Sequence, residues 1–224
     1  MGVESGRVMT EQTFDTLDVL VQQQLTWHHV PGIAVGTLID GDIRTHAYGT
    51  INLKTGYPTR PDTLFQMGSI SKVFTATLAM RLADEGHLDL DTPVAEYLPD
   101  LRLADANAQE VITTRHLLTH TSGLEGDIFE DYGVGDDALA TYVAQARRWK
   151  QETPPGEQWS YCNSGFSLAG LVIETVPGQT FEAVMREQVF EPLGLTYACF
   201  FAQEAIVHSA AAGHLQLPGE EQPH

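Results

Sequence analysis

A serine and a lysine three residues apart are the first candidates for chemistry in this chain. Ser69 and Lys72 open a largely apolar segment, residues 69–85, that is expected to be helical, so both side chains would lie on one helix face. Lys72 could then act as the base for the Ser69 hydroxyl, and the positive helix end would stabilise an oxyanion. The pattern indicates acyl transfer through a covalent bond to Ser69. Alone it is a weak signal, because about one chance match is expected in a chain of this length.

A tyrosine and an asparagine further along the chain are the second candidates. Tyr161 and Asn163 are expected in a loop that leads into a helix over residues 163–176. A phenol hydrogen-bonded to a lysine ionises more readily and can relay a proton, while an asparagine amide can bind both a lysine and a substrate carbonyl. Tyr-x-Asn is also common by chance, and an aromatic beside a helix more often belongs to a core. The order of the two motifs is what gives them weight.

The charge of the chain excludes several classes of partner. Twelve Lys and Arg stand against 30 Asp and Glu, which gives a formal net charge of −18. This charge repels phosphate backbones and anionic lipid surfaces, so neither nucleic acid nor a membrane is expected as a partner. No apolar run is long enough to span a bilayer. Residues 1–13 lack the apolar stretch of a secretory signal, so we expect a cytoplasmic protein, or a periplasmic or secreted one if a signal was removed.

Hydrophobic spacing predicts the elements that must position these residues. Apolar residues at helical intervals between positions 14 and 25 predict a first helix. Residues 33–39 and 43–48 predict two strands joined by a turn that contains glycine, hence an antiparallel hairpin. The segment 69–85 is apolar on all sides, which predicts a buried helix. Further helices are expected over residues 115–120, 136–150 and 163–176 and between residues 180 and 191, and the pattern weakens after Thr196.

Five further stretches occur in a fixed order and, with the two motifs, extend from about residue 14 to about residue 200. They are Val-Pro-Gly-Ile-Ala-Val at 30–35, residues 61–69, Ile-Thr-Thr-Arg-His-Leu-Leu-Thr-His-Thr-Ser-Gly-Leu at 112–124, residues 155–163 and Glu-Pro-Leu-Gly-Leu at 191–195. Together they resemble the serine β-lactamase-like family, which includes class C β-lactamases, penicillin-binding D-alanyl-D-alanine carboxypeptidases and family VIII carboxylesterases. A tyrosine at position 161, where other members have a serine, is similar to the class C and esterase branches.

This resemblance implies an α/β (α+β) fold of the β-lactamase/transpeptidase type, with an antiparallel sheet flanked by helices, a mostly helical lobe and an active site between them. We expect one domain over residues 1–224, in which residues 10–66 form the helix and hairpin of the α/β lobe and residues 67–200 form the helical lobe. The resemblance makes Ser69 the acylated nucleophile. The other implied roles are general base and acid for Lys72 and Tyr161, and positioning of substrate and Lys72 for Asn163.

The family has a third motif, Lys-Thr-Gly or His-x-Gly, on a strand that follows Tyr-x-Asn. Here Lys-Thr-Gly stands at residues 54–56, before Ser69 and among turn-forming residues, which predicts a surface turn. No lysine follows Asn163, and His208 and His214 are poor substitutes. The C-terminal strands of the family are also not recognisable, and a two-stranded hairpin leaves an edge uncovered. We therefore expect an incomplete active site, which a C-terminal segment or a second chain would complete.

Two classes of function remain open. One is a serine hydrolase that acts on a small ester, β-lactam or D-amino-acid amide without a cofactor, with esterase-like activity and weak β-lactam turnover. The other is a catalytically silent scaffold, a penicillin-binding module or an inactive fragment.

The remaining candidate metal ligands and the free cysteine have simpler structural explanations. His116 and His120 have the spacing of zinc ligands, but no third ligand is evident, and the acidic residues 125–137 are better explained as a solvated loop than as a calcium site. Cys162 is expected to be a small buried filler.

Overall fold

The computed structural model describes residues 11–219 and residue 223, and it divides into two compact units. The first unit contains the described residues up to Gln66 and those from Cys199 onward, and the second is Met67–Ala198. The predicted boundary between residues 66 and 67 coincides with this division. The described residues from Cys199 onward belong to the first unit, including residues 199 and 200, which the sequence placed in the helical lobe. That the two units form a single, incomplete domain stays a prediction.

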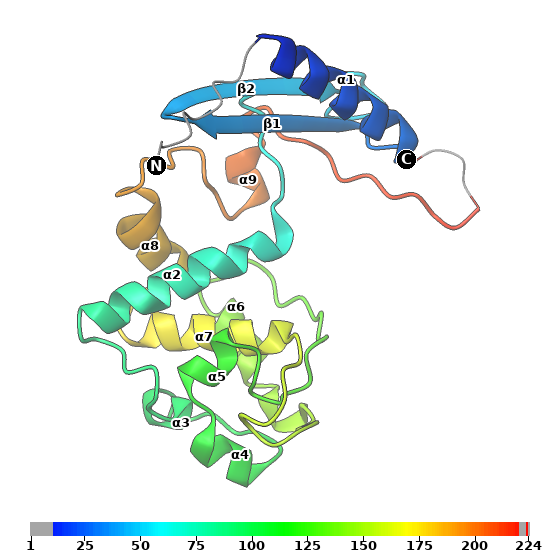
Figure 1. Ribbon diagram of the computed structural model, residues 1–224. Coiled ribbons are helices and arrows are strands. Elements are labelled where there is room, and N and C mark those ends of the chain that lie inside the picture. The colour runs from blue at the N-terminus through cyan, green and yellow to red at the C-terminus, as the bar shows by residue number, and fades with distance from the viewer. Residues whose placement is uncertain (1–10, 220–222, 224) are drawn as a thin grey trace, which may run out of the picture. The chain divides into compact units, whose positions relative to one another are not determined.

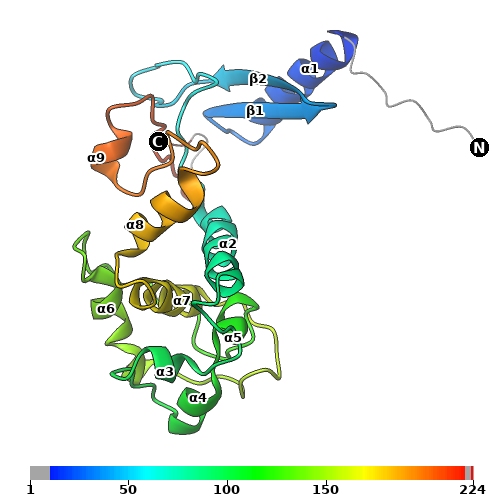
Figure 2. The ribbon, with the colours of Figure 1, turned by 90° about the vertical axis from the view of Figure 1, so that its left-hand side faces the viewer.

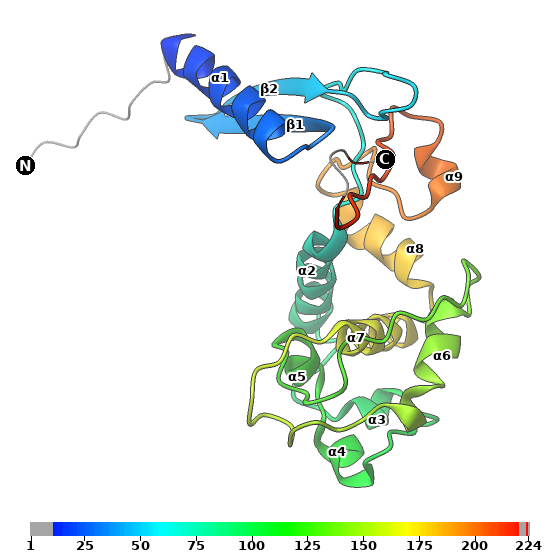
Figure 3. The same cartoon turned by 90° about the vertical axis from the view of Figure 1, so that its right-hand side faces the viewer.

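A helix and a β-hairpin form most of the first unit. Helix α1 (Glu11–Trp27) precedes strands β1 (Gly32–Ile39) and β2 (Asp42–Gly49), which pair antiparallel from Gly32 opposite Gly49 to Ile39 opposite Asp42 (Figure 1). The predicted hairpin is confirmed. Both turn residues between the strands have positive φ angles, which matches the right-handed twist of the strands. Helix α1 crosses one face of the hairpin (Figure 3), where the hydroxyl of Tyr48 donates a hydrogen bond to Asp18.

The end of the chain joins the first unit through backbone hydrogen bonds. Leu64 forms a parallel bridge with Ala210, and Ala212 donates its N–H to the carbonyl of Ile51 at 2.9 Å. A short helix, α9 (Ala202–Ala205), precedes this bridge and was not predicted. The segment has no apolar periodicity, so its sequence carries no signal of this pairing. No apolar side chain is buried among the described residues of the first unit.

The second unit is helical and has its core around α7 (Asn163–Thr175). Leu168, Ala169, Val172 and Ile173 are fully buried there, and α7 contacts α2, α5, α6 and α8 (Figure 2). The helices around α7 and the short helical turns between them are α2 (Ser71–Asp84), α3 (Val94–Tyr97), α4 (Ala106–Val111), α5 (Thr114–Leu118), α6 (Ala138–Val143), α8 (Phe181–Met185), the 3₁₀ turns η1 (Gly68–Ile70) and η2 (Ala146–Arg148), and the π-helical turn η3 (Arg186–Phe190).

Three helix predictions are corrected by the structure. Helix α2 is not buried on all sides, because Val73 and Met80 are exposed while Leu78 and Ala79 are fully buried. The helix predicted over 136–150 is interrupted between α6 and η2, where hydrogen bonding tightens to an i,i+3 pattern and the following Trp149 turns into the core. The helix predicted between residues 180 and 191 begins as α8 and continues as the wider turn η3. Each difference reflects packing that a periodicity of 3.6 residues does not encode.

Candidate active site

Ser69 lies in the turn η1, just before α2. Gly68 has a φ of 53°, in the left-handed region that favours glycine, and it leads the chain into this turn. Lys72 follows in the first turn of α2, and its Nζ lies 3.5 Å from the Oγ of Ser69. A 3₁₀ turn has three residues per turn, so residues i and i+3 align on one side. Lys72 thus lies close to Ser69, as its spacing predicts, and Ser69 is exposed; α2 itself begins at Ser71.

Asn163 joins Lys72 from the opposite helix. It is the first residue of α7, and its Oδ1 accepts a hydrogen bond of 2.8 Å from the Nζ of Lys72. The Nδ2 of Asn163 donates in turn to the Oδ1 of Asp127 at 3.2 Å. The amide is therefore held from both ends, with its oxygen toward the ammonium and its nitrogen toward the carboxylate. A continuous polar series runs from Asp127 through Asn163 and Lys72 to Ser69.

Tyr161 completes the predicted set of four. The Nζ of Lys72 lies 4.9 Å from the ring centroid of Tyr161 and 5.4 Å from that of Phe166, within the range of cation–π interaction. Hydrogen bonding from Lys72, and secondly from Ser69, lowers the pKa of the Tyr161 phenol below its ordinary value, and partial removal from water opposes this shift. The phenol therefore ionises more readily than a free tyrosine. All four predicted residues meet within the second unit.

His120 fixes the segment that carries Tyr161. Its backbone has a φ of 59°, and its carbonyl accepts a hydrogen bond of 2.9 Å from the N–H of Ser160. Its Nδ1 accepts a second one of 3.0 Å from the N–H of Cys162. The imidazole also lies against the Tyr161 ring, with 4.5 Å between centroids. Burial, and then the charge of Lys72, lower the pKa of His120, which favours the neutral ring that can accept through Nδ1.

The backbone segments around Gly126 and at the start of α7 are closely packed beside the site. Cys162 is buried, as predicted, and its Sγ accepts a hydrogen bond of 3.2 Å from the N–H of Gly165. The carbonyl of Gly126 accepts from the N–H groups of Asn163 and Ser164 at 3.0 and 3.2 Å. A Cβ at Gly126 would come within 2.6 Å of the Tyr161 carbonyl oxygen, so this close approach requires glycine. The loop before α6 and the start of α7 are thus fixed together.

Two residues of the site were not predicted. The sequence places Asp127 in the acidic stretch 125–137, which is best explained as a solvated loop, and nothing in it links Asp127 to Asn163. The sequence gives a weak indication that Phe166 belongs to the site, because Phe166 lies three residues after Asn163 and so shares its side of α7. The structure adds both to the surroundings of Lys72.

The Lys-Thr-Gly triplet at residues 54–56 lies in the first unit. The Oδ1 of Asn52 accepts hydrogen bonds from the N–H groups of Lys54 and Thr55 at 2.8 and 3.2 Å, and Gly56 has a φ of 68°. All three residues are exposed. The predicted surface turn is confirmed. His214 also lies in this unit, where its Nε2 accepts from the N–H of Leu53 at 3.1 Å.

Both histidines with zinc-ligand spacing take part in local hydrogen bonds. The Nδ1 of His116 accepts from the N–H of Thr113 at 3.2 Å within a capping box, and that of His120 accepts from Cys162. Among the described residues, no three His, Cys, Asp or Glu side chains lie together as a metal site would require. Over the same residues, none of the helices combines the length and the apolar character needed to cross a membrane.

Comparison with known proteins extends these observations. The profile of the beta-lactamase family matches residues 17–223. Penicillin-binding protein 4 of Amycolatopsis lactamdurans is 42% identical over 190 residues, which are 85% of this chain and 50% of that protein. Esterase EstB of Burkholderia gladioli is 32% identical over 204 residues, or 84% and 52% of the two chains. The structure of the octameric penicillin-binding protein homologue from Pyrococcus abyssi superposes with a TM-score of 0.79 at 29% identity, covering 94% of this chain and 50% of that one. The chain thus spans about half the length of these relatives.

Proposed function

Because this chain belongs to the beta-lactamase family and has the β-lactamase/transpeptidase-like fold, we propose that it acts as a serine hydrolase with Ser69 as the nucleophile. One observation carries the proposal. The Nζ of Lys72 lies 3.5 Å from the Oγ of Ser69 and donates to Asn163 at 2.8 Å, so the amino group that is proposed to share general-base duty with Tyr161 is held beside the hydroxyl. Such a pair is what activates a serine, which is a weak nucleophile unaided.

In the proposed reaction, the Oγ of Ser69 attacks the substrate carbonyl carbon while its proton passes to the ionised phenol of Tyr161 beside Lys72, the two residues sharing the duties of general base and acid. The new C–O bond produces a tetrahedral oxyanion, which the N-terminal end of α2 helps to stabilise. The oxyanion collapses, the bond to the leaving group breaks, and the leaving group receives the proton. Water then attacks the ester on Ser69, which releases the acid and restores the hydroxyl. Asn163 positions Lys72 and the substrate carbonyl.

Esters are the proposed substrates, with weak or absent turnover of β-lactams. An esterase and a penicillin-binding protein among the relatives support an ester or amide carbonyl. The sequence has no lysine after Asn163, so the lysine of the family's third motif, which would bind a substrate carboxylate, has no counterpart in that part of the sequence. We propose that a C-terminal segment or a second chain supplies it. The unburied apolar residues of the first unit support such a partner, because a two-stranded hairpin is marginally stable by itself.

Covalent labelling tests this function directly. The 224-residue chain is treated with a fluorophosphonate, and peptides are examined by mass spectrometry, with Ser69→Ala as the matched control. We expect one adduct on Ser69 and none in the variant, and faster hydrolysis of p-nitrophenyl butyrate than of a chromogenic cephalosporin. A folded protein without an adduct on Ser69 would instead be the silent scaffold or penicillin-binding module.

A further inference from the structure

A cavity of about 530 Å³ adjoins the candidate active site within the second unit. Lys72 and Asn163 line one part of it, and the rest is formed by the segment after Asp127, by α6 and α7, and by the start of α8. Its volume is in the range of cavities that hold small organic molecules. Because it begins at the residues proposed to hold the substrate carbonyl, a group placed in it would be a substituent of that same substrate.

Aromatic side chains form much of the lining. They come from four segments and are Phe129, Tyr132, Tyr142, Phe166 and Phe181. The rings of Tyr132 and Tyr142 meet edge to face, with 6.1 Å between centroids. The Tyr142 hydroxyl donates to the carbonyl of Ile128 at 2.8 Å, and burial raises the pKa of Tyr142 to about 12, so this ring stays neutral. The electron-rich faces of such rings attract apolar groups and cations.

The charges around the cavity are mostly negative. Among the described residues that line it, Glu130, Asp131 and Glu182 are acidic and Lys72 is basic. Glu130 accepts a hydrogen bond from the Tyr132 hydroxyl, and the Oδ1 of Asp131 accepts one of 2.8 Å from the N–H of Gly133. A carboxylate has about four acceptor positions, so each of these two can bind a further partner. The charge of Arg148 opposes the rise in the pKa of the Tyr132 phenol. Arg148 does not line this cavity but a neighbouring pocket, and Glu130 lines both.

Aromatic faces combined with carboxylates are the surroundings that alkylated ammonium groups require. We propose that the cavity is a subsite for a cationic, alkylated ammonium substituent of the substrate, an inference that rests on the proposed reaction at Ser69. Lys72 would repel an ammonium placed close to the scissile carbonyl. The charge of the substituent is therefore separated from that carbonyl by a short methylene chain, and it lies toward the carboxylates.

An isosteric pair of esters tests this preference. p-Nitrophenyl 4-(trimethylammonio)butyrate and p-nitrophenyl 5,5-dimethylhexanoate have the same acyl shape and differ in one atom, a cationic nitrogen against a neutral carbon. We expect kcat/KM of the 224-residue chain to favour the cationic ester by about tenfold. A ratio near one, with the neutral ester turned over, would overturn the subsite and leave the proposed hydrolase standing. Failure of both esters to acylate Ser69 would instead contradict the hydrolase.

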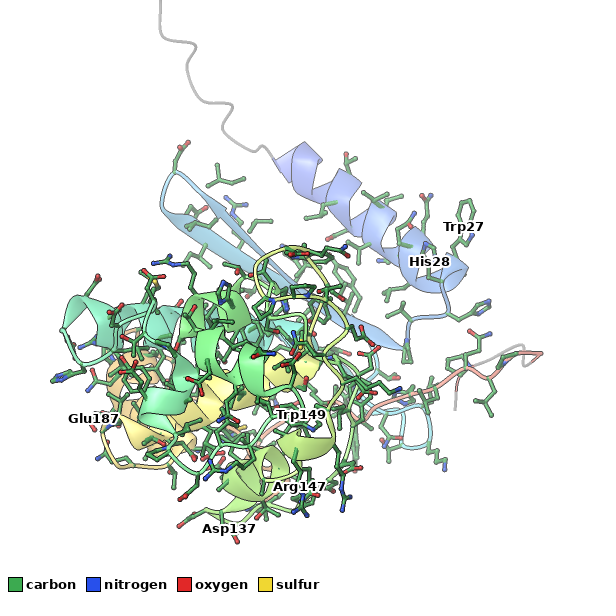
Figure 4. The ribbon with its side chains drawn as sticks, turned by 90° about the horizontal axis from the view of Figure 1, so that it is seen from below. Trp27, His28, Asp137, Arg147, Trp149 and Glu187 are labelled. Atoms are coloured by element: carbon green, nitrogen blue, oxygen red, sulfur yellow. The ribbon has the colours of Figure 1, made fainter. Side chains whose placement is uncertain are left out.

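Matched variants separate the subsite from the general negative charge of the protein. Glu130→Gln combined with Asp131→Asn removes two charges at the cavity, and Asp136→Asn combined with Asp137→Asn removes two from exposed positions outside its lining. Asp137 lies at the outer edge of the second unit (Figure 4). We expect the first pair to lower the cationic preference several-fold and the second pair to leave it nearly unchanged. Equal loss in both would assign the preference to the whole protein's field and overturn the subsite.

Binding without turnover gives an independent measurement. In Ser69→Ala, calorimetric titration with N-methyl-4-(trimethylammonio)butanamide and with its neutral counterpart N-methyl-5,5-dimethylhexanamide compares the same two shapes. Tighter binding of the cationic amide, reduced by Glu130→Gln with Asp131→Asn, supports the subsite even if hydrolysis is slow. Equal binding of the two amides, or no dependence on the two carboxylates, contradicts it.

Discussion

Tyr161 is the residue whose ionisation decides how the proposed base works. Its ring faces the Nζ of Lys72 at 4.9 Å, and hydrogen bonding from Lys72 and Ser69 lowers the pKa of its phenol. The phenolate can accept a proton and the phenol cannot, so acylation of Ser69 should rise with pH through that pKa, below the ordinary value of 10.0.

We expect Tyr161→Phe to lower the rate of fluorophosphonate labelling by about 10²- to 10⁴-fold and to remove this rise. Labelling rates measured over a pH series would show both effects. The exposed Tyr57 of the first unit provides the control, since Tyr57→Phe should keep the rate and the pH profile of the wild type. An unchanged profile in Tyr161→Phe would exclude the tyrosine from proton transfer and leave Lys72 as the base.

His120, which holds the segment that carries Tyr161, also makes the free energy of unfolding depend on pH. Its folded-state pKa is lowered by burial and by Lys72, so the unfolded chain binds more protons at a pH below the ordinary value of 6.5. The stability that the neutral imidazole contributes is therefore present above 6.5 and is lost as pH falls through the lower, folded-state pKa.

The variant His120→Asn isolates what the neutral imidazole contributes to the free energy of unfolding. Asparagine tolerates the positive φ of position 120 and keeps an acceptor for the Cys162 N–H, but it does not titrate in this range. We expect urea unfolding to show that the free energy of unfolding of the wild type declines more steeply below pH 6.5 than that of His120→Asn. Parallel pH profiles would contradict the assignment.

The residues of the site differ in how far the sequence revealed them. Ser69 and Lys72 were found because their spacing is local and survives the change from an α-helix to a 3₁₀ turn. Asn163 needed the order of the motifs, since its hydrogen bond to Lys72 joins two helices far apart in sequence. Asp127 could not be found, because its contact depends on the path of an irregular loop that no periodicity describes.

At the scale of elements, the loop that carries Asp127 depends on one close backbone contact. Gly126 lies against the chain just before α7, and an added Cβ would approach the Tyr161 carbonyl oxygen to 2.6 Å and the Cα of Cys162 to 3.2 Å. Both neighbours are backbone atoms, so the loop or the start of α7 must shift. The shift would separate Asp127 from the amide of Asn163.

We therefore expect Gly126→Ala to lower the free energy of unfolding by about 1–3 kcal/mol and to slow labelling of Ser69. Thermal and urea unfolding measure the first effect, and the fluorophosphonate reaction measures the second. Gly36→Ala in β1 is a suitable control, because nothing lies within 4 Å of its added Cβ. Wild-type stability and labelling in Gly126→Ala would show that the contact does not position the site.

Local patterns predicted the elements better than their ends. The hairpin was placed within one residue at each strand end, because the turn that contains glycine lies between two strand-forming runs and marks where each strand stops. The helix expected over 136–150 was interrupted, since burial of Val143 and Trp149 requires the chain to turn between them. Helix α9 and the bridge at Ala210 carry no apolar repeat and could not be predicted.

At the scale of the whole molecule, the two units differ in how much apolar surface they bury. Every buried apolar residue of the described chain lies between Leu78 and Phe190, inside the second unit. Burial of apolar surface is the main source of folding free energy, at about 25 cal/mol per Å². The first unit relies on the hairpin ladder, on the contact between Tyr48 and Asp18, and on backbone bonds to its C-terminal residues.

The amide hydrogen-exchange rates of the two units should therefore differ. We expect amides of β1 and β2 to exchange at least about tenfold faster than those of α7, after correction for intrinsic rates, because a two-stranded hairpin without a core opens at low free-energy cost. Mass spectrometry of peptic peptides over a time series measures this, and peptides from within α7 report the unfolding of the core. Equal protection would show that the hairpin already has its stabilising partner in this chain. Faster exchange would mark its strands as the place where a C-terminal segment or a second chain could add strands and complete the sheet.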